Sequence, residues 1–548
     1  MPAPLDAAWR AARERWRALD GTARLWRRDA SLFTGGDEHR WLGWLDLPDR
    51  PLDPQLAELQ RAVAEQGVRR VVLLGMGGSS LGAEALAANL ATGDAPAFTV
   101  IDTTEPEAVA AALAALDAEP TLVIAASKSG GTLETDLLLR AFSARASPER
   151  VAVVTDPGSA LERQAREQGY RWSFAGDPEV GGRFSVLSAF GLAPAAALGL
   201  PVAGLLAGAR EAAAGCRQAD PELNPGVALG TLLAAAVDRG RDLLTVLAGA
   251  SGPAAFADWL EQLVAESLGK GGTGVLPVIG EEPDLARRAA SQRIYLALAP
   301  RAPATADLEG SDEPVVAGDV AGARALGFEL FRWEVATAVA GSLLGVHPFD
   351  QPDVESAKAA TRAWIERAAR GEELAWGAPV ARAPGIAAFA PREAGEGAAA
   401  EGSIALAVER FLAGASPGEP CALLAFLPAS PPVRAALARL RRELAVRFGV
   451  VTTLGLGPRY LHSTGQLHKG GPERGRYLVF SRAAAAVPAG ARVPVPGLPL
   501  SFAEVHAAQA LGDFEALAAR GRRVLRLELE DDPADSLTRL AAGLAACS

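Results

Sequence analysis

The chain has 548 residues, of which 49% are hydrophobic and 22% are charged, and its formal net charge is −11. This length exceeds what a single hydrophobic core organises, so we expect about two to four domains. The acidic balance excludes a protein that coats nucleic acid or an anionic membrane, although a phosphate group could still bind at a local site.

Residues 1–60 are predicted to form an N-terminal helical arm. Five tryptophans lie in this arm with arginines between them: Trp9, Trp16, Trp26, Trp41 and Trp44. Aromatic and basic residues together can indicate nucleic-acid binding. Because the rest of the chain is acidic, packing of the arm against the body of the protein is the favoured interpretation.

Residues 61–200 alternate short apolar runs with helical stretches, which predicts a first domain with a doubly wound parallel sheet. The expected strands are residues 70–74, 98–101, 121–125 and 151–155, and the expected helices begin near Leu81, Glu105, Leu133 and Ser159. Ligands of such sheets bind beyond the carboxyl ends of the strands. The loops that follow these strands are therefore candidate binding loops.

The alternation restarts in residues 201–370, which predicts a second domain of the same kind. Its expected strands are residues 243–247, 275–279 and 293–298, and its expected helices are residues 254–268 and 329–344. Residues 371–402 are rich in Ala, Gly and Pro and are predicted to be a linker. Residues 403–548 form a third predicted α/β region, with strands at 421–426, 450–454, 476–480 and 523–527 and a helix at 433–448.

The cysteines and the N-terminal residues indicate the cellular compartment in which the protein is expected. Cys216, Cys421 and Cys547 lie far apart, are odd in number and lack metal-ligand spacing. This pattern argues against a disulfide framework and fits a reducing cytoplasm. We see no signal peptide, and each apolar run is too broken to span a bilayer. We therefore expect a cytoplasmic protein.

Lysine is scarce in this chain. Of 54 basic residues only four are lysines: Lys128, Lys270, Lys358 and Lys469. A solvated surface cation can be either Lys or Arg, whereas a tight site that needs a compact ammonium cannot hold a planar guanidinium. The four lysines are therefore candidates for positions where geometry matters, and chance survival is the alternative.

Two loops after predicted strands combine glycine with hydroxyl groups. The first, Gly75-Met-Gly-Gly-Ser-Ser-Leu-Gly82, has neither dinucleotide-binding nor P-loop spacing and could be only a tight turn. The second, Ser127-Lys-Ser-Gly-Gly-Thr-Leu-Glu-Thr135, carries four hydroxyls and a lysine. Hydroxyls and amides at a helix N-terminus suit phosphate oxygens, and one helix cap needs only one hydroxyl. We therefore predict a phosphate site in the second loop.

Two further motifs supply candidate catalytic groups. Gly181-Gly-Arg-Phe-Ser-Val-Leu-Ser188 presents an arginine that could contact a substrate oxygen or form a loop salt bridge. Gln262-Leu-Val-Ala-Glu-Ser-Leu-Gly-Lys270 ends a predicted helix, and its glutamine and glutamate share one face. The glutamate is a candidate general base, with an ordinary exposed helix-end residue as the alternative.

The last two motifs lie in the C-terminal half. In Pro348-Phe-Asp-Gln-Pro-Asp-Val-Glu-Ser-Ala-Lys358, the glutamine and the lysine are about two helical turns apart and can face one pocket. His462-Ser-Thr-Gly-Gln-Leu-His-Lys-Gly-Gly471 holds two of the five histidines. No cysteine or carboxylate stands at zinc-ligand spacing beside them, so no metal site is predicted. His39 and His506 are expected to be structural.

Together these motifs resemble the phosphoglucose isomerase family, whose members contain two sugar-isomerase (SIS) domains. The resemblance rests on S-K-S-G-G-T-x-E-T, V-G-G-R-F-S, E-S-x-G-K and F-D-Q-x-x-V-E-x-x-K, and it covers the whole chain. The chain looks most like the isomerase portion of fused transaldolase–glucose-6-phosphate isomerases, without a transaldolase half. The resemblance implies that the first two domains are SIS-type domains.

The resemblance also implies roles for individual residues. Glu266 would move a proton between C1 and C2 of the sugar, with Gln262 nearby, and Arg183 would stabilise the enediolate. Gln351 would contact the substrate, and Lys358 would assist the ring chemistry. The residues expected to bind the sugar and its phosphate are Gly78, Ser79, Ser127, Lys128, Ser129, Thr132 and Thr135.

The ring-opening histidine of the family lies in a G-Q-H motif before the F-D-Q segment. The nearest match here is Gly465-Gln-Leu-His468, which has an inserted leucine and follows that segment. His468 is the predicted residue, and His462 or His347 could serve instead. The family's glycine in F-D-Q-x-G-V-E is Asp353 here.

The resemblance implies a homodimeric isomerase that interconverts glucose 6-phosphate and fructose 6-phosphate, in glycolysis and gluconeogenesis, without metal or cofactor. Two alternatives stay open. A noncatalytic SIS-type sugar-phosphate sensor would not need Glu266, Arg183 and Lys358 together. An isomerase of broader specificity would also use mannose 6-phosphate.

Overall fold

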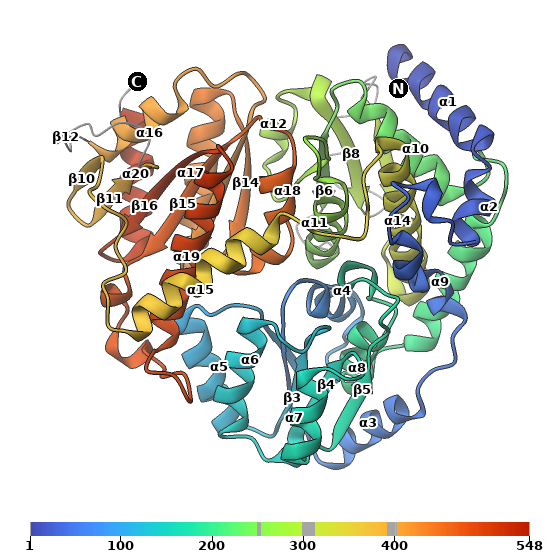
Figure 1. Ribbon diagram of the computed structural model, residues 1–548, viewed down its shortest axis with the longest axis horizontal. Helices are drawn as coiled ribbons and strands as arrows, with labels where there is room; N and C mark the ends of the chain where they lie inside the picture. The colour runs from blue at the N-terminus through green and yellow to red at the C-terminus, as the bar shows by residue number, and fades with distance from the viewer. Residues whose placement is uncertain (1, 249–253, 299–312, 392–399, 402, 547–548) are drawn as a thin grey trace. The chain divides into compact units, whose positions relative to one another are not determined.

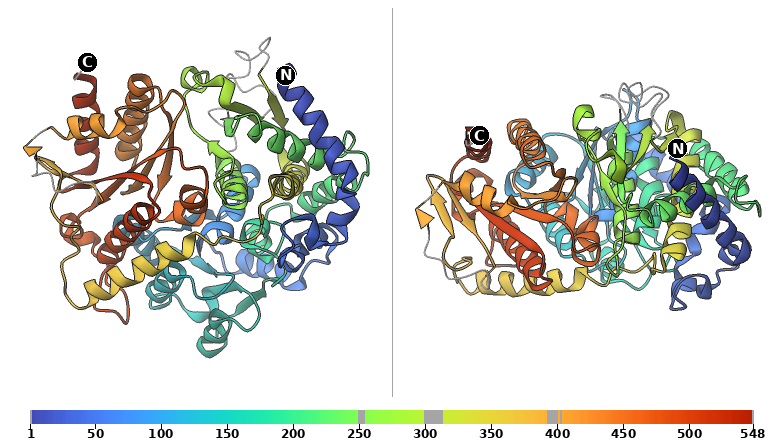
Figure 2. Two further views of the ribbon diagram at one scale, coloured as in Figure 1. Left: turned by 45° about the horizontal axis from the view of Figure 1, so that its top comes forward. Right: turned by 90° about the horizontal axis from the view of Figure 1, so that it is seen from above.

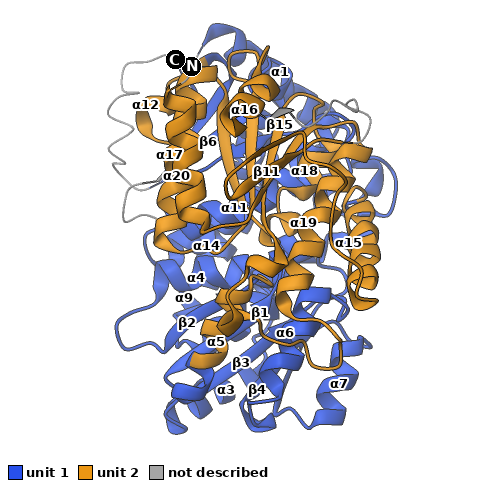
Figure 3. Ribbon diagram, turned by 90° about the vertical axis from the view of Figure 1, so that its left-hand side faces the viewer, with its two compact units in different colours: residues 1–102, 115–280, 291–351 blue, residues 103–114, 281–290, 352–548 orange. Residues whose placement is uncertain are grey.

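The structure is a computed structural model that describes residues 2–248, 254–298, 313–391, 400–401 and 403–546. The chain divides into two compact units, coloured separately in Figure 3. Unit 1 comprises residues 1–102, 115–280 and 291–351, and unit 2 comprises residues 103–114, 281–290 and 352–548.

The first sheet of unit 1 has five parallel strands in the order β2-β1-β3-β4-β5. Three of them, β3, β4 and β5, are labelled in Figure 1. These are β1 (Arg70–Gly75), β2 (Ala97–Ile101), β3 (Thr121–Ala126), β4 (Val151–Thr155) and β5 (Trp172–Ala175). Strands β3 and β4 are buried along their whole length, as expected for a sheet covered on both faces. The associated helices are α3 (Pro54–Glu65), α4 (Leu81–Leu90), α6 (Leu133–Ser143), α7 (Ala160–Gln168) and α8 (Ala189–Ala197).

The second sheet of unit 1 has four parallel strands in the order β7-β6-β8-β9. These are β6 (Leu243–Ala248), β7 (Leu276–Val278), β8 (Arg293–Leu298) and β9 (Val315–Gly318). The helices in this part are α9 (Val202–Cys216), α10 (Pro225–Val237), α11 (Ala254–Leu268) and α14 (Gly322–Leu344). Figure 2 gives two further views of them.

The N-terminal arm packs on unit 1 through its tryptophans. It contains α1 (Ala3–Ala18), α2 (Gly21–Trp26) and three 3-10 turns before α3. Trp16 and Trp44 are fully buried, and Trp9 Nε1 donates to Ala228 O of α10 at 2.9 Å. The predicted packing of the arm against the body is therefore confirmed.

Unit 2 is built on a seven-stranded mixed sheet in the order β12-β10-β11-β16-β15-β13-β14. Its strands are β10 (Ala381–Ala383), β11 (Ile386–Phe389), β12 (Ala400–Glu401), β13 (Pro420–Phe426), β14 (Val451–Leu456), β15 (Arg476–Arg482) and β16 (Arg523–Leu529). Its helices are α12 (Pro283–Ala286), α15 (Val354–Ala369), α16 (Ile404–Leu412), α17 (Pro431–Phe448), α18 (Gly465–Gly470), α19 (Phe502–Ala519) and α20 (Pro533–Ala546). Helix α5 (Pro106–Ala118) begins in unit 2 and ends in unit 1.

The three sheets share one strand order. Numbered along the chain within each sheet, the parallel strands run 2-1-3-4 in the first, second and third sheet alike. In this order the loops after the first and third strands lie side by side at the carboxyl edge, where open α/β sheets bind ligands. The predicted α/β class with parallel sheets is confirmed.

Several elements differ from the predicted ones. Strands β5 and β9 were not predicted, because each is a short edge strand of only four residues. Helix α14 starts at Gly322 and not at residue 329, since its glycines hid the helical pattern. Those glycines have a packing role: a Cβ on Gly327 would lie 1.9 Å from Leu205 O of α9. Residues 371–402, predicted to be a linker, contain β10, β11 and β12.

No helix of the described residues is long and apolar enough to cross a membrane. Within the same residues, no group of three or more His, Cys, Asp or Glu side chains is placed to hold a metal ion. Cys216 and Cys421 are buried free thiols, and burial raises the pKa of each to about 12. Cys547 lies outside the described residues.

Candidate active site

Arg183 is the centre of a buried polar cluster in unit 1. Its Nε donates to Ser267 Oγ at 2.8 Å, and its Nη1 donates to Gln351 Oε1 at 3.1 Å. Its Nη2 donates to the backbone carbonyls of Pro348 and Asp350, at 2.7 and 2.8 Å. Burial lowers the pKa of the Arg183 side chain, but a guanidinium still stays charged near neutrality. The site therefore contains a cation fixed by four acceptors.

Glu266 faces this guanidinium from the last turn of α11. Its Oε1 lies 3.4 Å from Arg183 Nη1, and its Oε2 accepts a hydrogen bond from Gln262 Nε2 at 2.9 Å. The residue is 8% exposed, so the alternative of an ordinary exposed helix-end glutamate is excluded. A carboxylate held beside a fixed cation can take up a proton and return it.

The glycine loop after β1 lies directly against the Arg183 segment. A Cβ on Gly78 would lie 2.0 Å from Gly182 O, so only glycine permits this approach. Ser185 Oγ donates to Gly78 O at 3.3 Å, and Ser79 is buried. The structure therefore brings together two motifs that are about a hundred residues apart in the sequence.

The hydroxyl-rich loop after β3 lies at the same sheet edge. Strands β1 and β3 pair in parallel, with Gly75 opposite Ala126, so the loops that follow them are neighbours. Ser127 Oγ and Thr132 Oγ1 are 3.0 Å apart, and Ser129 Oγ accepts from the Gly131 amide at 3.3 Å. The loop leads into α6, whose N-terminal amides and dipole favour an anion.

Two side chains of this motif have distinct environments. Lys128 does not extend freely, since its Nζ donates to Asp156 Oδ2 at 2.5 Å and to Asp177 O at 2.8 Å. It therefore anchors the loop. Thr135 is 2% exposed, and its Oγ1 has no hydrogen-bond partner in the described part of the chain. Gly130 has φ +66°, a value that an L-amino acid rarely adopts.

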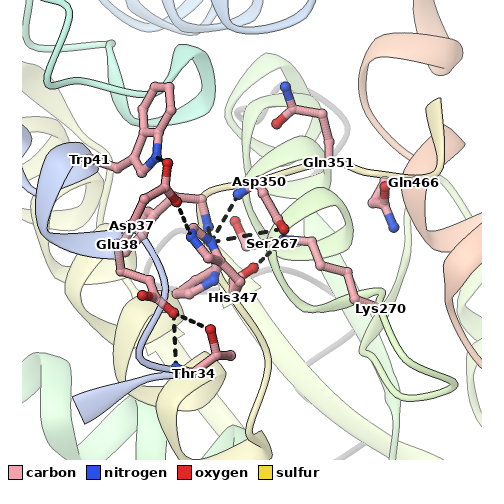
Figure 4. Close-up of polar contacts among 12 residues, drawn as sticks. Thr34, Asp37, Glu38, Trp41, Ser267, Lys270, His347, Asp350, Gln351 and Gln466 are labelled. Carbon is pink, nitrogen blue, oxygen red and sulfur yellow. Dashed lines mark hydrogen bonds and ion pairs between the residues drawn. The ribbon is translucent and has the colours of Figure 1, made fainter. Parts of the chain in front are cut away.

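Lys270 is a buried cation that was not among the predicted site residues. Its Nζ lies 2.9 Å from Asp350 Oδ1 and also donates to His347 O (Figure 4). Burial, followed by the nearby Arg183 charge, lowers the pKa of Lys270 to about 7. The scarcity of lysine and the E-S-x-G-K motif were the sequence signals that pointed to this residue.

The remaining predicted residues lie in unit 2. Lys358 is half-exposed on α15, where its Nζ donates to Glu355 Oε1 at 2.7 Å. His468 is 4% exposed in α18, with its ring 5.9 Å from that of Tyr460 and 5.3 Å from that of Tyr477. Burial, together with Lys469 and Arg522, lowers the pKa of His468 to about 3. The ring is therefore neutral at pH 7.

The two alternative histidines have different environments. His462 is half-buried in unit 2. Both ring nitrogens of His347 are engaged: Nε2 with Asp37 Oδ1 at 2.9 Å, and Nδ1 with the amides of Phe349 and Asp350 at 3.1 and 3.2 Å. His347 as an alternative ring-opening residue stays a prediction, as does His462.

Known proteins resemble a large part of this chain. A family model described as phosphoglucose isomerase matches residues 59–275. The chain is 31% identical over 392 residues to a glucose-6-phosphate isomerase of Thermus thermophilus, a match that covers 60% of this chain and 92% of that protein. The chain belongs to the phosphoglucose isomerase family. This confirms the family that the sequence motifs predicted.

Two other similarities extend the comparison. A glucose-6-phosphate isomerase of Carboxydothermus hydrogenoformans is 34% identical over 252 residues, covering 42% of this chain. The chain spans only about half, 53%, of that relative's length. A crystal structure of a glucose-6-phosphate isomerase from Chlamydia trachomatis matches with a TM-score of 0.53 and 19% identity, covering 66% of this chain and 86% of the other. At this identity the structural match supports the fold alone.

Sequence reasoning located the main groups of the cluster but not their supports. Within unit 1, Gly78, Ser79, Arg183, Gln262, Glu266 and Gln351 come together as the motifs suggested. Ser267, Lys270 and Asp350 complete the cluster and were not among the predicted site residues, whereas His347 had been named only as an alternative ring-opening histidine. The likeness to the fused transaldolase–isomerase proteins stays a prediction.

Proposed function

We propose that the protein is a glucose-6-phosphate isomerase that interconverts glucose 6-phosphate and fructose 6-phosphate. The observation that carries this proposal is the pairing of Glu266 with Arg183 at 3.4 Å in a buried cluster beside the hydroxyl-rich loop. Relatives that bear the name glucose-6-phosphate isomerase support it. The chemistry follows from what each group can do.

The reaction needs a base and a cation at adjacent positions. In the open-chain aldose, the C2 proton is acidic because the neighbouring carbonyl stabilises the carbanion as an enediolate. Glu266 removes this proton and returns it to C1, while Gln262 holds its second oxygen. Arg183 stabilises the negative enediolate oxygen, and its four acceptors fix it before the charge develops.

The substrate is held at its phosphate end by the loop after β3. Ser127, Ser129, Thr132 and Thr135 supply hydroxyls, and Lys128 fixes the loop through Asp156. Gly78 and Ser79 contact the sugar from the adjacent loop. Remote phosphate binding of this kind orients the reacting carbons toward the base.

Three further assignments belong to the proposal. His468 opens the sugar ring and Lys358 assists it, and Gln351 contacts the substrate beside Arg183. The protein acts as a homodimer in the cytoplasm. Sedimentation tests the dimer directly: a monomer that is stable and fully active would contradict it.

A coupled assay of the purified chain tests the function. We expect turnover of glucose 6-phosphate and fructose 6-phosphate that survives exhaustive chelation, because the steps use side chains alone. Mannose 6-phosphate is assayed in parallel to define specificity. Binding of these esters without any turnover would contradict the proposed enzyme and indicate a noncatalytic sugar-phosphate sensor.

A further inference from the structure

The position of Arg183 depends on one short segment of unit 1, residues 347–351. Two of the four acceptors of its guanidinium are backbone carbonyls of this segment, those of Pro348 and Asp350. A third is the side chain of Gln351 at 3.1 Å. A change in the turn of this segment would therefore move the arginine.

The turn is held by the ring of His347. Its Nδ1 accepts hydrogen bonds from the amides of Phe349 and Asp350, two and three residues further on, at 3.1 and 3.2 Å. This is the same local bonding that an Asn or Asp side chain uses to fix a turn. Pro348 O, which accepts from Arg183, shares a peptide group with the bonded Phe349 amide. Asp350 O lies one peptide beyond the bonded Asp350 amide, on the same residue.

The partners of the ring assign its tautomer. An Nδ1 that accepts from two amides carries no proton, so the ring proton of the neutral imidazole is on Nε2. Nε2 then donates to Asp37 Oδ1 at 2.9 Å, and Asp37 also accepts from Trp41 Nε1 at 3.1 Å (Figure 4). Asp37 in the N-terminal arm therefore selects the tautomer that the turn needs.

Two other contacts tie the segment to the site. Lys270 binds both His347 O and the Asp350 carboxylate. Phe349 packs edge-to-face on Phe184, the residue after Arg183, with ring centroids 5.2 Å apart. The segment thus contacts the arginine through its carbonyls and contacts the neighbouring backbone through an aromatic ring.

We infer that His347 is a positioning residue of the isomerase, which fixes Arg183 through the two amide hydrogen bonds to its Nδ1. This inference rests on the proposed function, because it gives the arginine a task at the enediolate. The contact of Nε2 with Asp37 selects the tautomer. The hydrogen bonds to Nδ1 hold the turn and thereby position Arg183. The phosphate loop is a separate segment, so substrate binding should change little.

Two isosteric substitutions separate the ring nitrogens. In His347→Asn, the amide oxygen can occupy the place of Nδ1 and accept from both backbone amides, while the contact with Asp37 is lost. In His347→Gln, the longer amide reaches Asp37 but leaves the two backbone amides without their acceptor. We expect His347→Asn to keep kcat within about fivefold and His347→Gln to lose about 10- to 100-fold, as displacement of a catalytic group by up to 1 Å would.

The experiment measures kcat and KM for both variants, with thermal melting as a check of folding. The matched control is His39→Ala, an exposed histidine two residues from Asp37. We expect KM to stay within about threefold in all three variants. Nitrogen-15 NMR of the wild-type ring should show an unprotonated Nδ1 and a protonated Nε2.

Several outcomes would overturn the inference. They are a His347→Gln enzyme with wild-type kcat, a His347→Asn enzyme as impaired as His347→Gln, or a wild-type ring with the proton on Nδ1. If His347→Gln does not fold, the result for His347→Asn and the NMR tautomer decide. A wild-type protein without isomerase activity would refute the proposed function instead, while the NMR tautomer would still test the turn.

Discussion

The loops after the third strands of the first and third sheets can be compared directly, since both sheets have the parallel order 2-1-3-4. In the first sheet, residues 127–132 read Ser-Lys-Ser-Gly-Gly-Thr, with three hydroxyls and a glycine at φ +66°. In the third sheet, the residues that follow β15, 483–487, read Ala-Ala-Ala-Ala-Val. Val487 is buried in an apolar cluster with Ala491 and Ala503. The first loop therefore carries groups that can bind an anion, whereas the second loop packs into an apolar cluster.

The third sheet nevertheless has a cavity near the carboxyl ends of its strands. A cavity of about 740 Å³ is lined by the end of β15 and by part of β16. The arginines of its lining are each paired with a glutamate: Arg482 with Glu107, Arg492 with Glu504, and Arg526 with Glu528. One strand order thus supports a hydroxyl-rich loop in one place and, in another, a cavity whose arginines are paired with glutamates. The loop chemistry, and not the fold, decides the function.

The largest difference between the two loops should come from removing hydroxyls. We expect the double change Ser129→Ala and Thr132→Ala to raise KM for the sugar phosphates by about 10²-fold or more, since hydrogen bonds to charged groups contribute about 1.5–3 kcal/mol each. The matched change in the third sheet, Arg482→Gln, should leave KM unchanged. Steady-state kinetics of both variants measures this, and equal effects would remove the contrast between the loops.

A smaller effect is expected from the glycines of the first loop. In Gly130→Ala the new Cβ would lie 2.8 Å from Ser159 Cβ at φ +66°, a strain of about 1–3 kcal/mol. We expect a KM increase of about tenfold. Gly131→Ala is the control, because its Cβ would meet no atom closer than 4.0 Å. A Gly131→Ala enzyme that is impaired as much as Gly130→Ala would show that space and φ are irrelevant here.

A third expected effect concerns stability and pH. The pKa of Lys270 falls from 10.5 to about 7 on folding, because burial disfavours its charged form. Above pH 7 and up to pH 10.5 the unfolded chain therefore binds a proton that the folded chain releases, so this residue makes the free energy of unfolding rise with pH in that window. Below pH 7 its contribution is constant.

The variant Lys270→Met isolates the contribution of Lys270 to the pH dependence of stability. We expect the melting temperature of the wild type, relative to that of the variant, to rise between about pH 7 and pH 9 and to stay flat below pH 7. Lys358→Met is the matched control, since Lys358 is half-exposed and pairs with Glu355 on its own helix. A difference between wild type and Lys270→Met that is independent of pH would contradict the buried, proton-releasing lysine.

The sequence was sufficient for most of the architecture because the strands are apolar runs of ordinary length. Strands β4 and β8 and helix α11 match their predicted bounds or differ by one residue. Strand β5 escaped prediction because its residues alternate between buried and exposed over only four positions. The strands within residues 371–402 escaped it because a segment rich in Ala, Gly and Pro has no clear strand pattern.

For the candidate site, local motifs pointed to individual residues of the buried cluster but not to their environment. The glutamate and the arginine stand in recognisable motifs, so Glu266 and Arg183 could be named in advance. The contact between Asp37 and His347 joins residues 310 positions apart, and no spacing rule predicts such a contact. The role of His347 in a turn also needs the backbone conformation, which sequence alone did not supply.

The central claim is that Glu266 transfers the proton in a site whose phosphate is held by the first-sheet loop. Isomerisation in D₂O, followed by proton NMR of C1 and C2, tests it most directly, with Glu266→Gln compared to the exposed control Glu58→Gln. We expect the wild type and the control to introduce solvent deuterium, and Glu266→Gln to lose about 10²–10⁴-fold in rate while still binding the sugar phosphate. Deuterium exchange by Glu266→Gln within a few-fold of the wild-type rate would contradict the account.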